Sequence, residues 1–200
     1  IEGNGFFKVR NADGEVCYTR DGSFNLMTTI EGDTMLCTSG GHPVLDQNNN
    51  TIIVPSEYTD AGGNTFKTTG KMNVDRQGNI YITYIDSENN AEKEVPLTDV
   101  LNGNGYNKII GVVQFSNPAG LDQAGDNLYK ETVISGVPIE ESANDGLKKS
   151  SVHQGYLEMS NVQVADEMVN MIVAQRAYEM NSKAIQATDE MLQQANNLRR

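Results

Sequence analysis

Residues 160–198 read SNVQVADEMVNMIVAQRAYEMNSKAIQATDEMLQQANNL and contain neither Gly nor Pro, the two residues that most often interrupt a helix. A strict seven-residue series of side chains runs through this stretch, at Val164, Met171, Tyr178, Ile185 and Leu192. Seven-residue spacing keeps one face of a helix turned towards a partner helix over its whole length. The sequence therefore predicts one long helix with a coiled-coil seam, roughly 55–60 Å long at about 1.5 Å per residue.

The predicted helix is longer than a small domain is wide, so its apolar seam needs a partner in this chain or in another copy. The seam also carries small and polar residues, which permit close approach and fix the register of packed helices. A single amphipathic helix lying on its own β domain is the alternative. Because no second helix is predicted, we favour contact between copies. The residues that we expect at this helix–helix interface are Val164, Met168, Met171, Ile172, Tyr178, Ile185 and Leu192, with Gln175 and Arg176 as polar residues that set the register.

The residues before this helix read as short strands joined by turns, and the chain has 19 Gly but only 5 Pro. Strands predicted at residues 6–10 and 16–19 flank an Asn-Ala-Asp-Gly turn, because Asp-Gly between apolar runs is a strong hairpin signal. The same signal recurs at Asp21 and Gly22. A Gln-Gly-Asn turn precedes a strand at residues 80–85, which is rich in β-branched and aromatic side chains.

The most apolar strand is predicted at residues 109–115, and we expect it at the centre of a sheet. Loops are predicted at residues 46–50 and 87–94, and a polar connector follows at residues 140–153. The predicted fold class is therefore mainly β. One irregular, turn-rich antiparallel β domain is expected over residues 1–154, and a long C-terminal, coiled-coil-type α-helix over residues 155–200.

Charge and hydropathy exclude several kinds of partner. The chain has 27 acidic and 15 basic side chains, a net charge of -12, whereas nucleic-acid binding requires clustered Lys and Arg. No apolar run approaches the about 20 residues that span a bilayer. We therefore expect neither nucleic-acid binding nor membrane insertion.

Residues with catalytic chemistry are few and scattered. Cys17 and Cys37 form no CxxC pair; they fit two buried strand residues, and a disulfide between neighbouring strands stays open. His42 and His153 fit turn or surface positions without a nearby nucleophile. The signatures GxSxG, HExxH and GxxxxGK[ST] do not occur, which removes the commonest nucleophile, zinc and phosphate-loop sites. We expect no enzyme activity, no catalytic residue and no cofactor.

One segment has the spacing of a calcium loop. Asp46, Asn48 and Asn50 alternate, and Glu57 stands at the twelfth position. The Gly that the sharp turn of such a loop requires is replaced by Thr51, and a proline lies inside the loop. A solvated turn is the better interpretation, so no metal site is expected.

Four stretches carry a resemblance to a known family: GNGFF at residues 3–7, YTRDGSF at residues 18–24, GYLEMSNV at residues 155–162 and VNMIVAQRAYE at residues 169–179. The chain resembles the bacterial flagellar rod, hook and hook-associated axial family. The stretches NPAGL at residues 117–121 and DNLY at residues 126–129, together with the segment 132–138, are more similar to rod than to hook members. The motif turn comprises Tyr18, Thr19, Arg20, Asp21, Gly22, Ser23 and Phe24.

This resemblance implies a structural subunit that is exported, polymerises helically outside the cytoplasm in the basal body, and transmits torque. The implied partners are copies of the same chain, other rod proteins and the hook protein, with ring proteins around the rod as a further partner that the resemblance allows. The family begins with an N-terminal helix that packs on the C-terminal helix, and this sequence starts at Ile1-Glu2-Gly3. We therefore expect the seam to be exposed or packed against another copy.

Three alternatives stay open at this point. The chain could be a hook protein or a proximal rod protein. It could be a cell-surface binding module with a helical stalk, whose target would bind the β domain. A hydrolase that uses scattered carboxylates is the third, and it would require a cleft with raised carboxyl pKa values.

Overall fold

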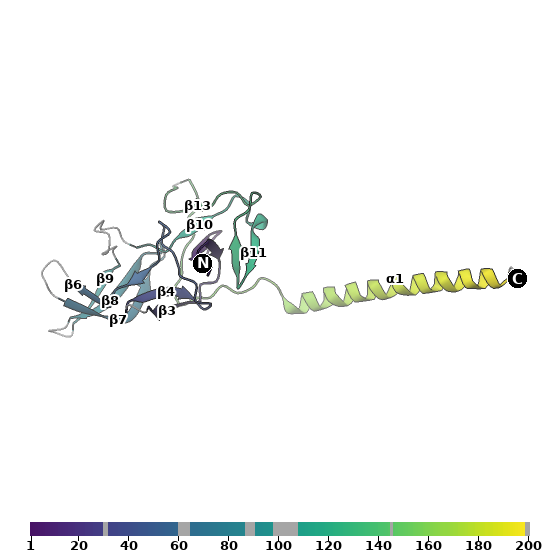
Figure 1. Ribbon diagram of the computed structural model, residues 1–200, viewed down its shortest axis with the longest axis horizontal. Coiled ribbons are helices and arrows are strands. Elements are labelled where there is room, and N and C mark those ends of the chain that lie inside the picture. Colours follow the sequence, from purple (N-terminus) through teal and green to yellow (C-terminus); the bar gives the residue numbers. More distant parts are fainter. Residues whose placement is uncertain (30–31, 60–64, 87–90, 98–107, 145, 199–200) are drawn as a thin grey trace. The chain divides into compact units, whose positions relative to one another are not determined.

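The computed structural model describes residues 1–29, 32–59, 65–86, 91–97, 108–144 and 146–198. The backbone divides into two compact units, Ile1–Glu158 and Met159–Arg200, and each is described by itself (Figure 1). The first unit holds the strands and the second holds the helix, so the predicted mainly β fold class with a C-terminal helix is confirmed. The division predicted after residue 154 lies a few residues before this one, because residues 155–158 belong to the first unit.

Antiparallel strands form three sheets in the first unit. Their strand orders are β11-β12-β2-β1-β10-β13, β3-β4-β5 and β6-β7-β8-β9. The bounds are β1 Phe6–Arg10, β2 Val16–Thr19, β3 Phe24–Thr28, β4 Thr34–Thr38, β5 Ile53–Val54, β6 Glu57–Thr59, β7 Thr65–Val74, β8 Ile80–Asp86, β9 Glu92–Pro96, β10 Val112–Gln114, β11 Asp122–Gly125, β12 Leu128–Lys130 and β13 Ile139–Glu140, with the 3-10 helix η1 at Pro118–Gly120.

Five-residue turns join several neighbouring strands. In residues 11–15 the Asn11 amide donates to the Glu15 carbonyl (2.9 Å), and the Glu15 amide donates to Asn11 Oδ1 (2.8 Å). Gly14 has a φ of 85°, which glycine adopts without steric cost. Residues 75–79 repeat this pattern, with Asp75 at the first position. The turns predicted from Asn-Ala-Asp-Gly and Gln-Gly-Asn are therefore confirmed.

Residues 46–50 form the same turn without a glycine, since Asn49 takes the positive φ of 62°. Asp46 Oδ1 accepts the amides of Asn48 and Asn50, both at 2.8 Å. The predicted loop is confirmed and residues 48–50 are exposed, as expected of a solvated turn, although the Asp46 side chain itself is only 3% exposed. Its carboxylate tolerates burial because backbone amides satisfy it.

The main hydrophobic core joins side chains from all three sheets. Val9 of β1, Leu36 of β4 and Ile80 of β8 are fully buried members of one cluster. Cys17 of β2 and Cys37 of β4 are also fully buried, and both are free thiols. The interpretation of the two cysteines as buried strand residues is therefore confirmed. Burial raises the pKa of both thiols, which keeps them protonated and unreactive near neutral pH.

The hairpin predicted at Asp21 and Gly22 is wrong. β2 ends at Thr19 and pairs with β1 and β12, whereas β3 begins at Phe24 and pairs with β4 in another sheet. Residues between them therefore carry the chain from one sheet to the next. An Asp-Gly pair is a local signal, and it does not specify which strands will pair.

Two other predicted segments differ in extent. The strand predicted at residues 109–115 is reduced to β10, and β10 lies second from the edge of its sheet, not at the centre. Ile109 and Ile110 form only isolated bridges, with Asn79 and Asp46, and a Cβ at Gly111 would lie 2.6 Å from the Asp46 carbonyl oxygen, so this close approach to the 46–50 turn requires glycine.

In the loop predicted at residues 87–94, residues 92–94 instead belong to the edge strand β9, whose Glu-Lys-Glu side chains are typical of a protected edge. Residues 87–90 of that loop lie outside the described residues.

In the described part of the second unit, residues 159–198, the one helix or strand is α1 at Val164–Leu198. The predicted helix is confirmed, although it begins at Val164 and not at Ser160. Asp166 and Glu167 lie in its first turn, where negative charge interacts favourably with the helix dipole.

Candidate assembly interface

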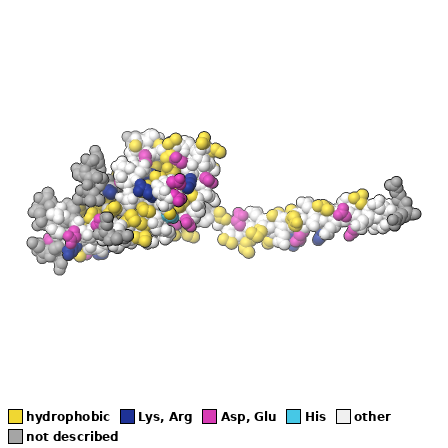
Figure 2. Space-filling model, viewed as in Figure 1, with side chains coloured by type: hydrophobic (Ala, Val, Ile, Leu, Met, Phe, Trp, Pro, Cys, Tyr) yellow, Lys and Arg dark blue, Asp and Glu magenta, His cyan; other side chains and the backbone are white. Residues whose placement is uncertain are grey.

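The predicted seam is exposed along α1. Val164, Met171, Tyr178, Ile185 and Leu192 are all between 60% and 77% exposed, and Figure 2 shows apolar side chains distributed along the helix. No residue of α1 is buried, and its unit contains no second helix or strand among the residues that the structure describes. The seam is therefore available to a partner.

The remaining predicted interface residues also lie on the surface of α1. Met168 and Ile172 are exposed apolar side chains. Gln175 Nε2 donates to Glu179 Oε1 one turn later (3.3 Å), and Arg176 is exposed. Their assignment to a helix–helix contact stays a prediction, because the structure contains one copy of the helix.

The motif turn has a role that its sequence did not indicate, centred on Arg20. The guanidinium donates from Nη1 to the Gly5 carbonyl (3.1 Å) and from Nη2 to the Gly3 carbonyl (3.1 Å). It also binds the Glu158 carboxylate in bidentate fashion, with 2.8 Å from Nε and 3.0 Å from Nη2. The same group lies 5.6 Å from the centre of the Phe6 ring. Three of the family-like stretches, at residues 3–7, 18–24 and 155–162, therefore meet at one side chain.

The rest of the motif turn supports this arrangement. Asp21 Oδ1 accepts the Ser23 hydroxyl (2.5 Å) and the Ser23 amide (2.9 Å). These Ser23 hydrogen bonds, the side-chain one first, lower the pKa of Asp21. Phe24 packs edge-on against Phe7 with ring centres 5.1 Å apart. Tyr18 is buried, and burial raises its pKa well above the usual range. These contacts hold the turn in place and offer no reactive group.

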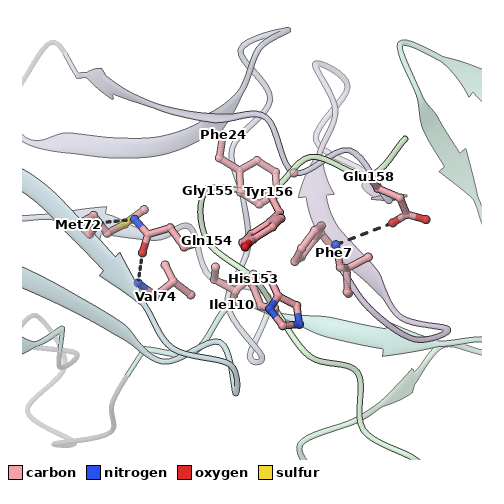
Figure 3. A pocket seen from close by; sticks show the side chains of 13 residues that line it. Phe7, Phe24, Met72, Val74, Ile110, His153, Gln154, Gly155, Tyr156 and Glu158 are labelled. Carbon is pink, nitrogen blue, oxygen red and sulfur yellow. Dashed lines mark hydrogen bonds and ion pairs between the residues drawn. The ribbon is translucent and has the colours of Figure 1, made fainter. Parts of the chain in front are cut away.

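The predicted polar connector is docked on the β domain. The Val152 amide donates to the Arg76 carbonyl (3.0 Å). Gln154 follows, accepting the Val74 amide (2.7 Å) and donating to the Met72 carbonyl (2.8 Å), as drawn in Figure 3. Its side-chain amide thereby satisfies backbone groups of β7 that a neighbouring strand would otherwise bind. The Arg20–Glu158 ion pair completes this attachment just before the first unit ends.

Sequence reasoning missed Glu141 and Ser150, which anchor the start of the same connector. Glu141 is 5% exposed, and its carboxylate accepts the Ser150 amide (2.6 Å), the Ser150 hydroxyl (2.7 Å) and Gln114 Nε2 (2.8 Å). Ser150 Oγ in turn accepts the Gly5 amide (3.0 Å). A Cβ on Gly5 would lie 2.6 Å from Val112. The GNGFF stretch at residues 3–7 was the signal in the sequence, because a close approach of the backbone requires Gly at position 5.

The two histidines occupy the positions expected of them. His42 lies in the turn after β4 and is partly exposed. His153 Nε2 lies 2.9 Å from the exposed Glu2 carboxylate. Among the described residues, no group of three or more His, Cys, Asp or Glu side chains could hold a metal ion. Within the same residues, no helix is both long and apolar enough to cross a bilayer.

Comparison with known families places the chain. The family domain described as "Flagellar hook protein FlgE/F/G D1 domain" matches residues 1–82, and "Flagellar basal body rod FlgEFG protein C-terminal" matches residues 153–198. The chain belongs to the flagellar rod and hook protein family. The two matched segments include the Arg20 turn and the Glu158 connector, so the residues that meet in the structure come from both matched domains of this family.

Relatives in the flagellar rod and hook family align along the whole chain. Flagellar basal-body rod protein FlgG of Borreliella burgdorferi is 41% identical over 100% of the chain, and FlgG of Bacillus subtilis is 36% identical over 100%. Flagellar hook-basal body complex protein FlhP of Bacillus subtilis is 30% identical over 94%. The chain covers 63%, 64% and 60% of these three proteins, respectively.

Proposed function

We propose that the chain is the β domain and C-terminal helix of a distal rod subunit, a non-enzymatic protein that polymerises helically in the flagellar basal body. The apolar seam of α1 carries this proposal, because it is exposed along its length and has no partner among the described residues of its own unit. A helix with seven-residue spacing builds a tube when each copy packs on the next. A heterologous contact that repeats without closing produces a helical filament.

The β domain supports the same function by its chemistry. The buried carboxylates of Glu141 and Asp46 are satisfied by hydrogen bonds within the domain. Its two thiols are buried and protonated. Transmission of torque from motor to hook requires many stiff contacts between subunits and no reactive residue. The proposed partners are therefore copies of the chain, the other rod proteins, the hook protein and ring proteins around the rod.

The rod assignment is tested by a double substitution on the seam, Met171→Asp with Ile185→Asp. Two buried charges without partners oppose helix packing, so the full-length variant should form no rod and give non-motile cells, while its β domain stays folded. Val173→Asp with Ala187→Asp is the matched control, because it adds the same charges at the same spacing away from the main series. Motile cells carrying the Met171/Ile185 variant would rule out the seam as the assembly interface.

A second candidate function is favoured by the similarity to FlhP, which is named as a hook-basal body complex protein. The chain could belong to a neighbouring segment of the same axial structure, such as the hook or the proximal rod. Higher identity to FlgG than to FlhP within Bacillus subtilis, 36% against 30%, favours the rod. Deleting the protein and finding which axial segment is the last to assemble separates these possibilities.

A further inference from the structure

An apolar tip projects from the β domain between β12 and β13. Val133, Ile134 and Val137 form this tip, and they are 101%, 74% and 79% exposed. The eight residues from 132 to 139 contain no charged side chain, on a chain whose net charge is -12. Contiguous exposed apolar side chains of this kind can mark an interaction surface.

The backbone under the apolar tip is firmly built. Ser135 is fully buried; its hydroxyl accepts the Thr132 amide and donates to the Thr132 carbonyl, both at 2.9 Å. Thr132 Oγ1 donates to the Gly120 carbonyl (2.6 Å), and the Asn117 amide donates to the Ser135 carbonyl (3.2 Å). A Cβ at Gly120 would lie 2.8 Å from the Ser135 nitrogen, so η1 packs directly against the loop. Little conformational entropy would be lost when this tip binds.

The same unit contains a pocket of about 200 Å³, whose lining combines apolar side chains with the polar side chains of His153, Gln154 and Glu158. Phe7, Phe24, Met72, Val74, Val152 and Tyr156 are among the residues that line it (Figure 3). Its volume exceeds the cavity of about 150 Å³ that accepts benzene in another protein, so it has room for a branched aliphatic side chain. The Glu158 carboxylate at the pocket is paired with Arg20, so this charge is neutralised.

We propose that the apolar tip of one copy inserts into this pocket of the next copy of this chain, where it meets the apolar part of the lining; this contact deepens the proposed rod function and rests on it. Copies that each carry -12 repel one another, so contact is favoured where both surfaces lack uncompensated charge, as the tip and the pocket do. A projection on one face and a pocket elsewhere on the same molecule give a heterologous contact, which extends without closing. The helix seam supplies one contact between copies, and the tip supplies a second one in the β layer.

Cross-linking of mixed variants tests this contact. Three side chains bury far less than the about 1,200 Å² of a stable interface, so a covalent trap is needed at high protein concentration. One preparation of the full chain carries Ile134→Cys and the other carries Tyr156→Cys, an 80% exposed position at the pocket. The native thiols are buried and should not compete. After oxidation of an equal mixture, the heterodimer should exceed the sum of the two homodimers, which is the amount that random pairing gives, and should exceed the heterodimer of the control pair several-fold.

The control pair is Met27→Cys with Tyr156→Cys, because Met27 is also an exposed apolar residue but lies on β3. Adding Val133→Asp and Val137→Asp to the Ile134→Cys chain should remove the excess heterodimer. The proposal would be overturned if the heterodimer yield only equals that of the control pair, or if the excess of heterodimer persists in the chain that carries Val133→Asp and Val137→Asp. Rod formation by the full-length protein, scored separately by electron microscopy, would then still stand, so failure of this contact is distinguishable from failure of the rod assignment.

Discussion

At the scale of single residues, Arg20 connects the most distant parts of the sequence. Its guanidinium donates four hydrogen bonds, two to carbonyls near the start of the chain and two to one carboxylate near the end of the first unit. Lysine could not reproduce this geometry, since it lacks the planar fork of the guanidinium. Arg20→Met should lower the free energy of unfolding by about 1–3 kcal/mol, the usual cost of leaving such polar groups unpaired. Urea denaturation measures the change.

The same substitution should also release the connector. Amide hydrogen exchange in residues 150–158 should accelerate in Arg20→Met more than in the sheets. Arg10→Met is the matched control, because the Arg10 guanidinium donates to the exposed Asn49 carbonyl and makes no contact with the connector. If the two variants lose equal stability and exchange alike, Arg20 does not fasten the connector.

Asp21 makes the motif turn sensitive to acid. Ser23 donates to its carboxylate and lowers its pKa, so the folded chain binds this proton less readily than the unfolded chain, where the pKa is about 3.9. The stabilisation is therefore complete above the unfolded pKa and disappears as pH falls through the lower, folded pKa. Asp21→Asn should be less stable than the wild type at neutral pH by about 1 kcal/mol, and the difference should shrink below about pH 4.

Denaturant unfolding at neutral and acid pH checks this expectation, with the exposed Asp122→Asn as control. Asparagine keeps an acceptor for Ser23 but no charge, so its stability should depend less on pH in this range. If the difference in the free energy of unfolding between wild type and Asp21→Asn stays constant on acidification, the charge of Asp21 does not contribute to stability.

At the scale of elements, we expect α1 to depend on association. Helices in water are stabilised mainly by packing of an apolar face, and α1 has no packing partner among the described residues of its unit. Its helical signal in far-ultraviolet circular dichroism should therefore fall when the protein is diluted. The Met171→Asp, Ile185→Asp variant should show the low helical signal of the dilute wild type at all concentrations. The near-ultraviolet signal of the β domain should stay constant. Helicity that is unchanged by dilution would mean that the helix is stable alone.

The success of sequence reasoning also differs between elements. α1, β1, β2 and the turn between these two strands were predictable, because periodicity and an Asp-Gly signal are properties of adjacent residues. The Asp21 turn was misread, since pairing of β2 with β12 and of β3 with β4 is decided by residues elsewhere in the chain. The Arg20–Glu158 contact joins residues 138 positions apart, and no local pattern indicates such a pair. The helix seam was predictable as an apolar face, but its partner is not specified by one chain.

At the scale of the whole molecule, we expect net charge to oppose the proposed assembly that the apolar surfaces favour. Copies with a net charge of -12 should repel one another at long range. The screening length falls from about 30 Å at 0.01 M salt to about 8 Å at 0.15 M. Apolar contacts at the seam are not weakened by this screening. Raising the salt concentration should therefore strengthen self-association, measured as the concentration at which sedimentation velocity first detects oligomers.

The sign of this salt effect separates two kinds of interface. An assembly driven by ion pairs between copies would weaken as salt rises, because exposed pairs are screened. An assembly driven by the seam and opposed by net charge would strengthen. Lys67→Glu with Lys71→Glu, at two exposed positions of β7, should increase the negative charge and shift the onset of association to higher salt without touching α1. Association that weakens with salt in the wild type would contradict the apolar seam as the dominant contact.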